Sequence, residues 1–178
     1  PDIEDGQATL AEINFARGEV ELFLAAADKA LAMNADNADM LGSFGHKMIN
    51  AGHTERGIAL MRRAVELNAN HPEWYQFAFF NYYWQLDDMD AALEAIQKVD
   101  MPDFFWTHVC RAEVCSRLGR VEEAREAVAR VLELYPDFGA NIWSEIAIWN
   151  VPPNVADSYV EALRGAGMEI PDRPVPTE

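Results

Sequence analysis

The sequence predicts an all-α protein in which about ten helices form antiparallel hairpins that stack into a right-handed superhelix. Three observations lead to this fold. Amphipathic helical stretches follow one another along the chain, glycines separate them, and one residue pattern returns about every 34 residues. Gly18 and Gly52 stand one such period apart, and Gly119 follows after nearly two more. At each glycine the chain is expected to turn between helices, because a positive φ costs glycine little.

The expected second helix of each unit keeps the same register. Residues 30–35, 64–69 and 131–136 align with one another, and residues 87–93 stand where residues 119–125 stand one unit later. A period near 34 residues with two amphipathic helices per unit is typical of tetratricopeptide repeats. The resemblance implies a concave inner face, formed by the first helices, that binds other proteins.

Small residues occupy the positions where the two helices of a unit must approach each other. Gly45 and Ala112 stand on first helices, and Gly57 and Ala124 stand on the matching second helices. Such pairs allow two helix backbones to touch. The third unit departs from this pattern, since Phe80 stands where the other units carry small residues.

The repeats are followed by a segment that we expect to cap the stack. Pro152 and Pro153 interrupt the chain there, and Asn154 can begin a last helix. We expect one domain over residues 1–170, with repeats at about 4–37, 38–71, 72–104 and 105–138, capping helices within 140–166, and an irregular tail over 171–178.

Charge and cysteine content restrict the partners and the compartment. Thirty acidic against 14 basic residues give a net charge of −16, which disfavours nucleic acid and anionic membrane surfaces as partners. No apolar run is long enough to span a bilayer. Cys110 and Cys115 are spaced so that they face different sides of a helix, which predicts two buried thiols and a cytoplasmic location.

The sequence contains no recognisable catalytic motif. The four histidines, which include His46 and His108, are scattered without metal-ligand spacing, so no metal site is expected. No phosphate-binding glycine loop and no nucleophile elbow occur. We therefore predict that this segment is not an enzyme and needs no cofactor.

The most distinctive stretch runs from Trp74 to Trp84, where eight of eleven residues are aromatic. Two interpretations stay open: the rings pack in the core of a central repeat, or some of them anchor a partner in the concave groove. Gly42 and Ser43 occupy positions where a basic carboxylate clamp would need cationic or amide side chains, so that mode is disfavoured. The repeat register predicts ten groove residues: Glu12, His46, Asn50, Trp74, Phe77, Asn81, Trp84, Trp106, Glu113 and Arg117.

Several longer strings resemble a particular group of repeat proteins. They lie at 37–42, 51–60, 63–75, 101–106, 118–124 and 159–168. Over about residues 30–165 the chain is similar to the C-terminal tetratricopeptide region of bacterial class III adenylate cyclases and related helix-turn-helix regulators. The resemblance implies a regulatory or sensory module attached to an output domain, and no catalytic residue is implied for this segment.

The preferred hypothesis is a protein–protein interaction scaffold that binds a peptide or partner helix in its concave groove. Two alternatives remain: a module that joins two copies into a homodimer, and a small-ligand sensor with an aromatic pocket. A helical-repeat enzyme that uses Glu12, His46 and Glu113 is a further rival.

Overall fold

The computed structural model describes the backbone of residues 3–174 and the side chains of residues 6–174. Within this range the chain forms ten α-helices and no strand, which confirms the predicted all-α fold. The helices are α1 (Ile3–Ala16), α2 (Val20–Met33), α3 (Ala38–Asn50), α4 (Thr54–Leu67), α5 (Tyr75–Gln85), α6 (Met89–Gln97), α7 (Phe105–Arg117), α8 (Val121–Leu134), α9 (Phe138–Ala147) and α10 (Pro153–Gly165).

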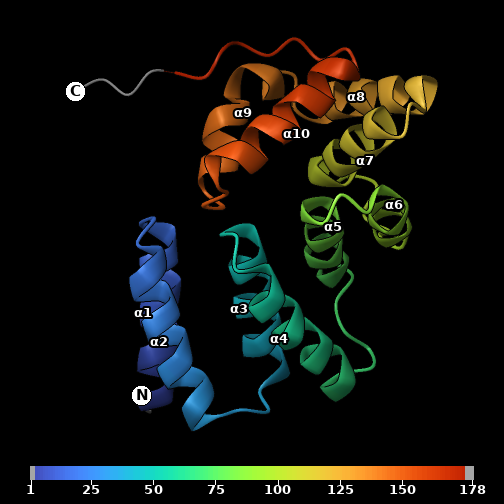
Figure 1. The fold of residues 1–178 in the computed structure, drawn as a ribbon. Coiled ribbons are helices and arrows are strands. Elements are labelled where there is room, and N and C mark those ends of the chain that lie inside the picture. The colour runs from blue at the N-terminus through green and yellow to red at the C-terminus, as the bar shows by residue number, and fades with distance from the viewer. Residues whose placement is uncertain (1–2, 175–178) are drawn as a thin grey trace.

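The first eight helices form four hairpins that follow one another along the molecule (Figure 1). Contacts are densest within the pairs α1–α2, α3–α4, α5–α6 and α7–α8. Neighbouring hairpins then join through α3 with α5 and α6 with α7. This arrangement is that of a helical-repeat solenoid, in which each unit buries its apolar face against the next.

The turns inside the four hairpins share one backbone conformation. Gly18, Gly52 and Gly119 have φ values of 75°, 86° and 70°, and Asp87 has φ 60° at the corresponding place in the third unit. In all four turns the next residue donates its N–H to the carbonyl oxygen five residues earlier, at 2.8–2.9 Å. This bond closes the helix C-terminus in the manner of a Schellman motif.

Glycines at the predicted crossing let α3 and α4 touch. A Cβ on Gly45 would lie 2.8 Å from the carbonyl oxygen of Gly57, and one on Gly57 would lie 2.8 Å from the backbone nitrogen of Ile49. Ala112 and Ala124 are fully buried at the matching place between α7 and α8. The repeat pattern therefore identified the close contacts inside these two hairpins.

Most aromatic side chains of α5 belong to the core. Tyr75 and Phe80 are fully buried, and Phe77, Tyr82 and Trp84 expose less than a tenth of their surface. Phe77, Phe80 and Trp84 join a large cluster that extends through α10. A central repeat is covered by neighbours on both sides, and this accounts for aromatic residues on more than one face of α5.

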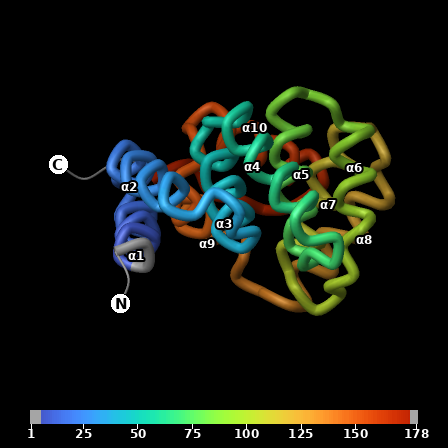
Figure 2. Tube along the Cα trace, turned by 90° about the horizontal axis from the view of Figure 1, so that it is seen from below, coloured from blue at the N-terminus to red at the C-terminus, as the bar shows by residue number. Residues whose placement is uncertain are grey.

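After α8 the chain turns back, so that α9, α10 and their connection lie beyond the ends of the first two hairpins (Figure 1 and Figure 2). Helix α10 packs against α7. The connection between α9 and α10 reaches the first two hairpins: the Asn150 side chain donates a hydrogen bond to the Phe15 carbonyl oxygen at 2.7 Å, and Pro152 lies against Gly52. The cap thus covers part of the inner face in addition to ending the stack.

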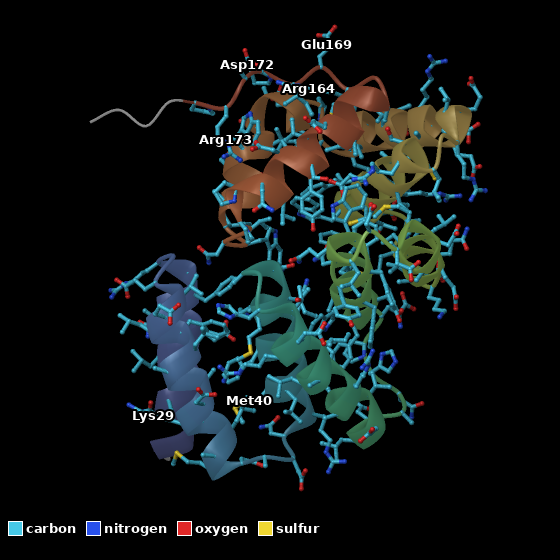
Figure 3. All side chains as sticks on the ribbon, in the orientation of Figure 1. Lys29, Met40, Arg164, Glu169, Asp172 and Arg173 are labelled. Atoms are coloured by element: carbon cyan, nitrogen blue, oxygen red, sulfur yellow. The ribbon has the colours of Figure 1, made fainter. Side chains whose placement is uncertain are left out.

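The segment after α10 is irregular but held in place as far as residue 174 (Figure 3). Arg164 on α10 donates to the Ile170 and Pro171 carbonyl oxygens and pairs with Asp172. The Arg173 guanidinium lies 4.6 Å from the centre of the Trp143 ring on α9. The rest of the expected tail, residues 175–178, lies outside the described range, as do residues 1 and 2.

Candidate functional site

A partly open cavity of about 210 Å³ lies where α3, α5 and α7 meet the cap. Its walls are largely apolar and include three tryptophans. Phe104 is its most exposed wall residue, at 37%. The lining consists of His46, Asn50, Trp74, Phe77, Asn81, Phe104, Trp106, Cys110, Glu113, Ile146, Trp149, Val151 and Tyr159. A concave, mainly apolar site with a few convergent polar groups is the usual form of a ligand pocket.

The cavity brings together most residues that the repeat register placed in the groove. They come from the first helices of the second, third and fourth hairpins, which stand side by side in the stack. These residues are His46, Asn50, Trp74, Phe77, Asn81, Trp106 and Glu113.

Three expected groove residues lie elsewhere. Trp84 is 4% exposed and packs against Tyr159 of α10, with ring centres 5.2 Å apart, because the cap covers this end of the inner face. Arg117 lies over the outer side of the Trp84 ring, 5.3 Å from its centre. Glu12 forms an ion pair with Lys47 at 3.0 Å between α1 and α3. These three side chains therefore do not line the cavity, and a role for them in partner binding stays a prediction.

His46 is held between two tryptophans. Its ring stacks on Trp74 of the third repeat at 5.9 Å and on Trp149 of the cap at 5.4 Å, measured between ring centres. One part of the ring lines the cavity, and protein atoms surround the rest of it. Burial, with a smaller contribution from the positive charge of Lys47, lowers the pKa of His46 to about 3. The imidazole is therefore neutral at physiological pH.

Hydrogen bonds connect the polar side chains of α3 and α5. The Asn81 Nδ2 donates to the Asn50 Oδ1 at 2.6 Å and lies 3.4 Å from the His46 Nε2. The Tyr159 hydroxyl of α10 approaches the Asn81 Oδ1 at 3.5 Å. Asn81 thus links the second repeat, the third repeat and the cap.

Glu113 on α7 has a different environment. The residue is 3% exposed, and within the described part of the chain no group donates a hydrogen bond to its carboxyl or forms an ion pair with it. Burial raises the pKa of Glu113 well above its usual value. Burial and the nearby Glu113 also raise the pKa values of Cys110 and Tyr159. A buried polar group without a partner is uncommon in native proteins and requires an explanation.

Sequence reasoning missed six wall residues. Phe104 precedes α7 and Cys110 stands on it, while the others belong to the cap, whose register is independent of the repeats. These others are Ile146, Trp149, Val151 and Tyr159. One signal in the sequence could have indicated the cap residues. Trp149 and Tyr159 are large aromatic side chains in a segment that was expected only to cover an apolar end of the stack.

A second hollow, of about 260 Å³, lies on the outer side between α4, α5 and α6. Its charged wall residues already pair with each other, since Lys98 donates to Glu94 at 2.8 Å. Both side chains are more than half exposed. It therefore lacks the unpartnered buried group that distinguishes the inner cavity.

Across the described residues, no group of three or more histidine, cysteine, aspartate or glutamate side chains is placed to hold a metal ion. Within the same range, no helix has the length and hydropathy needed to cross a bilayer.

Comparisons with known proteins agree with the fold. Residues 111–138 match the sequence profile of the tetratricopeptide repeat. A search of curated protein sequences finds no significant match. Two crystal structures of MamA resemble the whole chain. The first is 16% identical with a TM-score of 0.62, and the alignment covers 92% of this chain and 89% of that one. The second is 18% identical with a TM-score of 0.60, and 95% of each chain is covered. The shared feature is the helical-repeat fold of the tetratricopeptide type, a fold used for binding other proteins.

Proposed function

We propose that this tetratricopeptide-type solenoid is a protein-interaction module whose binding state depends on occupancy of its inner cavity. The observation that carries the proposal is the composition of the cavity wall, which combines three consecutive repeats with the C-terminal cap. An occupant would touch segments that are distant in sequence and would hold them together. As the resemblance to cyclase-associated repeats implies, the module would regulate an output domain in a longer signalling protein.

The connection between cap and first hairpins is slight enough for an occupant to affect it. It includes the Asn150 bond to Phe15 and the contact of Pro152 with Gly52. Inside the cavity, Trp149 of the cap reaches Trp74 through the His46 ring. A ligand that binds only the closed arrangement shifts the population toward it, by an amount set by its differential affinity.

Partner binding is proposed at the rim of the cavity and not along a continuous groove. Helix α10 lies on α7, so a long helix has no free path along that part of the inner face. Phe104 stands at the rim with 37% of its surface exposed. A partner would place one side chain, or close over one small ligand, at this position.

Site-specific photocrosslinking in cells tests the proposal. Benzoylphenylalanine would replace Phe104 at the rim or Leu132 on α8, which is 38% exposed and contributes nothing to the cavity wall. We expect a discrete crosslinked protein only from the Phe104 position, identified by mass spectrometry. The same adducts from both positions, or none from Phe104, would contradict partner binding at the rim.

A further inference from the structure

Glu113 is the feature of the cavity that protein structure alone does not explain. Among the residues that the structure describes, it is the only acidic residue in the wall, and no lysine or arginine lines the cavity beside it. No described group therefore supplies a counter-charge or a hydrogen-bond donor to the carboxyl group of this residue, which is 3% exposed. A retained group of this kind lowers stability unless something else binds it.

The amide and hydroxyl groups of the wall already have polar neighbours. Asn81 bonds to Asn50 at 2.6 Å and approaches Tyr159 and His46. The His46 ring is sandwiched between two tryptophans. The Glu113 carboxyl is thus the one acidic group in the described wall, it has no partner among the described residues, and it shares that wall with aromatic rings.

Aromatic rings around a carboxylate suit an organic cation. Trp74, Trp106 and Trp149 line the cavity together with Phe77 and Phe104. The faces of such rings attract ammonium groups, tryptophan most strongly, and the attraction grows when the site excludes water. The chain's net charge of −16 further favours cations over anions near the protein.

We propose that the cavity binds the ammonium group of a small organic amine, with Glu113 as its counter-ion and the aromatic walls around its apolar body. This assignment rests on the proposed function, for which it names the chemical class of the occupant. The size of the cavity limits the body: about 210 Å³ exceeds the roughly 150 Å³ that holds benzene in an engineered cavity. One ring with a short amine-bearing arm fits this space. The occupant proposed is a free molecule that fills this space, and a partner's lysine entering at the Phe104 rim is the alternative that the lysine peptide below represents.

Binding exchanges a proton without any covalent step. Before binding, burial favours the protonated form of Glu113 and raises its pKa. The arriving ammonium stabilises the carboxylate instead, so a carboxyl group that holds its proton releases it to solvent as the ion pair forms. The titratable groups that face Glu113 are His46 from α3, Cys110 from α7 and Tyr159 from α10, and their shifted pKa values keep all three neutral at physiological pH. Affinity for the amine should therefore rise with pH as Glu113 ionises more readily.

Calorimetry and tryptophan fluorescence on the full chain test the proposal. The probes are phenethylamine, its neutral analogue phenethyl alcohol, and a short glycine-flanked lysine peptide. Glu113→Gln removes the counter-ion while keeping its shape. Glu161→Gln removes the same charge from the exposed side of α10 and serves as the matched control.

We expect phenethylamine to bind with proton release, seen as a heat that depends on the ionisation enthalpy of the buffer. Its affinity should fall at least about 30-fold in Glu113→Gln and stay within about twofold in Glu161→Gln. Equal binding of phenethyl alcohol, or retained amine affinity in Glu113→Gln, would overturn the ammonium assignment but leave an occupied cavity, and with it the proposed function, intact. Tighter binding of the lysine peptide than of phenethylamine would overturn the free-amine assignment in favour of a partner's side chain. The absence of any fluorescence or heat change with all three probes would overturn the ammonium site. The proposed function would fail only if the crosslink at Phe104 were also missing.

Discussion

The two walls of the cavity treat buried polar groups in opposite ways. On the wall formed by α3 and α5, Asn81 bonds to Asn50 at 2.6 Å and lies within reach of His46. On the α7 wall, Glu113 is more deeply buried than Asn81 and His46 but has no partner among the described residues. Both walls occupy the same register of consecutive repeats, so the difference lies in the side chains and not in the backbone.

Asn81 and Asn50 are polar groups that maintain the fold, whereas Glu113 is not. A satisfied network fixes the relative position of the helices that contribute to it. A buried carboxyl group without a partner instead lowers the stability of the fold, because no hydrogen bond or counter-charge compensates for its desolvation. Natural proteins keep such costs mainly where function needs them. Substitutions in the two walls should therefore change stability in opposite directions.

The largest effect is expected from Asn81→Leu. This change removes the donor to Asn50 and the acceptor for Tyr159, and it leaves the remaining polar groups buried without partners. The free energy of unfolding should fall by about 2–3 kcal/mol, measured by urea denaturation at pH 7. Asn154→Leu, at an exposed position of α10, is the control and should change it by less than about 0.5 kcal/mol. Equal effects at both positions would show that the network contributes nothing specific.

Glu113→Leu should have the opposite sign. Replacing the unpartnered carboxyl by an apolar group of similar size should raise the free energy of unfolding by about 1–2 kcal/mol at pH 7. Since burial raises the pKa of Glu113 in the folded state, the wild-type carboxyl ionises more readily in the unfolded chain. The wild type therefore loses stability as pH rises above the unfolded value near 4.5, and the gain from leucine should be smaller below that pH. A loss of stability in the variant would mean that Glu113 is a structural residue.

Much of the fold could be predicted because the repeat imposes local rules. Gly18, Gly52 and Gly119 stand at positions that need positive φ, and the Gly45–Gly57 contact requires residues without bulk. Asp87 shows the limit of such rules. It adopts φ 60° although it is not glycine, and its carboxylate pairs with Arg117 of the next repeat.

The site could be predicted only where it follows the repeat. First-helix positions gave His46, Asn81 and Glu113 because equivalent positions of stacked repeats face the same side. The return of α9 and α10 over that side depends on tertiary packing, such as Tyr159 on Trp84. No period in the sequence encodes this contact, so the wall that the cap contributes to the cavity could not be inferred.

His46 provides a pH test of the bonded wall. Its pKa is about 3 in the folded chain and near 6.5 when unfolded, so between these values the unfolded state binds the extra proton. Stability from the neutral ring is complete above pH 6.5 and is lost as pH falls through that window. By pH 5.5 the wild type should have lost about 1 kcal/mol relative to His46→Phe, which keeps a ring between Trp74 and Trp149. Parallel stability curves for the two proteins would show that His46 titrates normally.

The smallest change in stability is expected at the exposed surface between the ends of α5 and α7. Arg117 at the end of α7 pairs with Asp87 after α5 and donates to Ser158 at 3.1 Å, but both charged side chains are more than a third exposed. Exposed pairs of this kind contribute little, because water solvates the separated charges almost as well. Arg117→Gln should lower the free energy of unfolding by no more than about 0.5 kcal/mol in thermal or urea denaturation, and should leave phenethylamine binding unchanged. A large loss of either would mean that this exposed ion pair, and not the hydrogen-bond network centred on Asn81, holds α5 and α7 together.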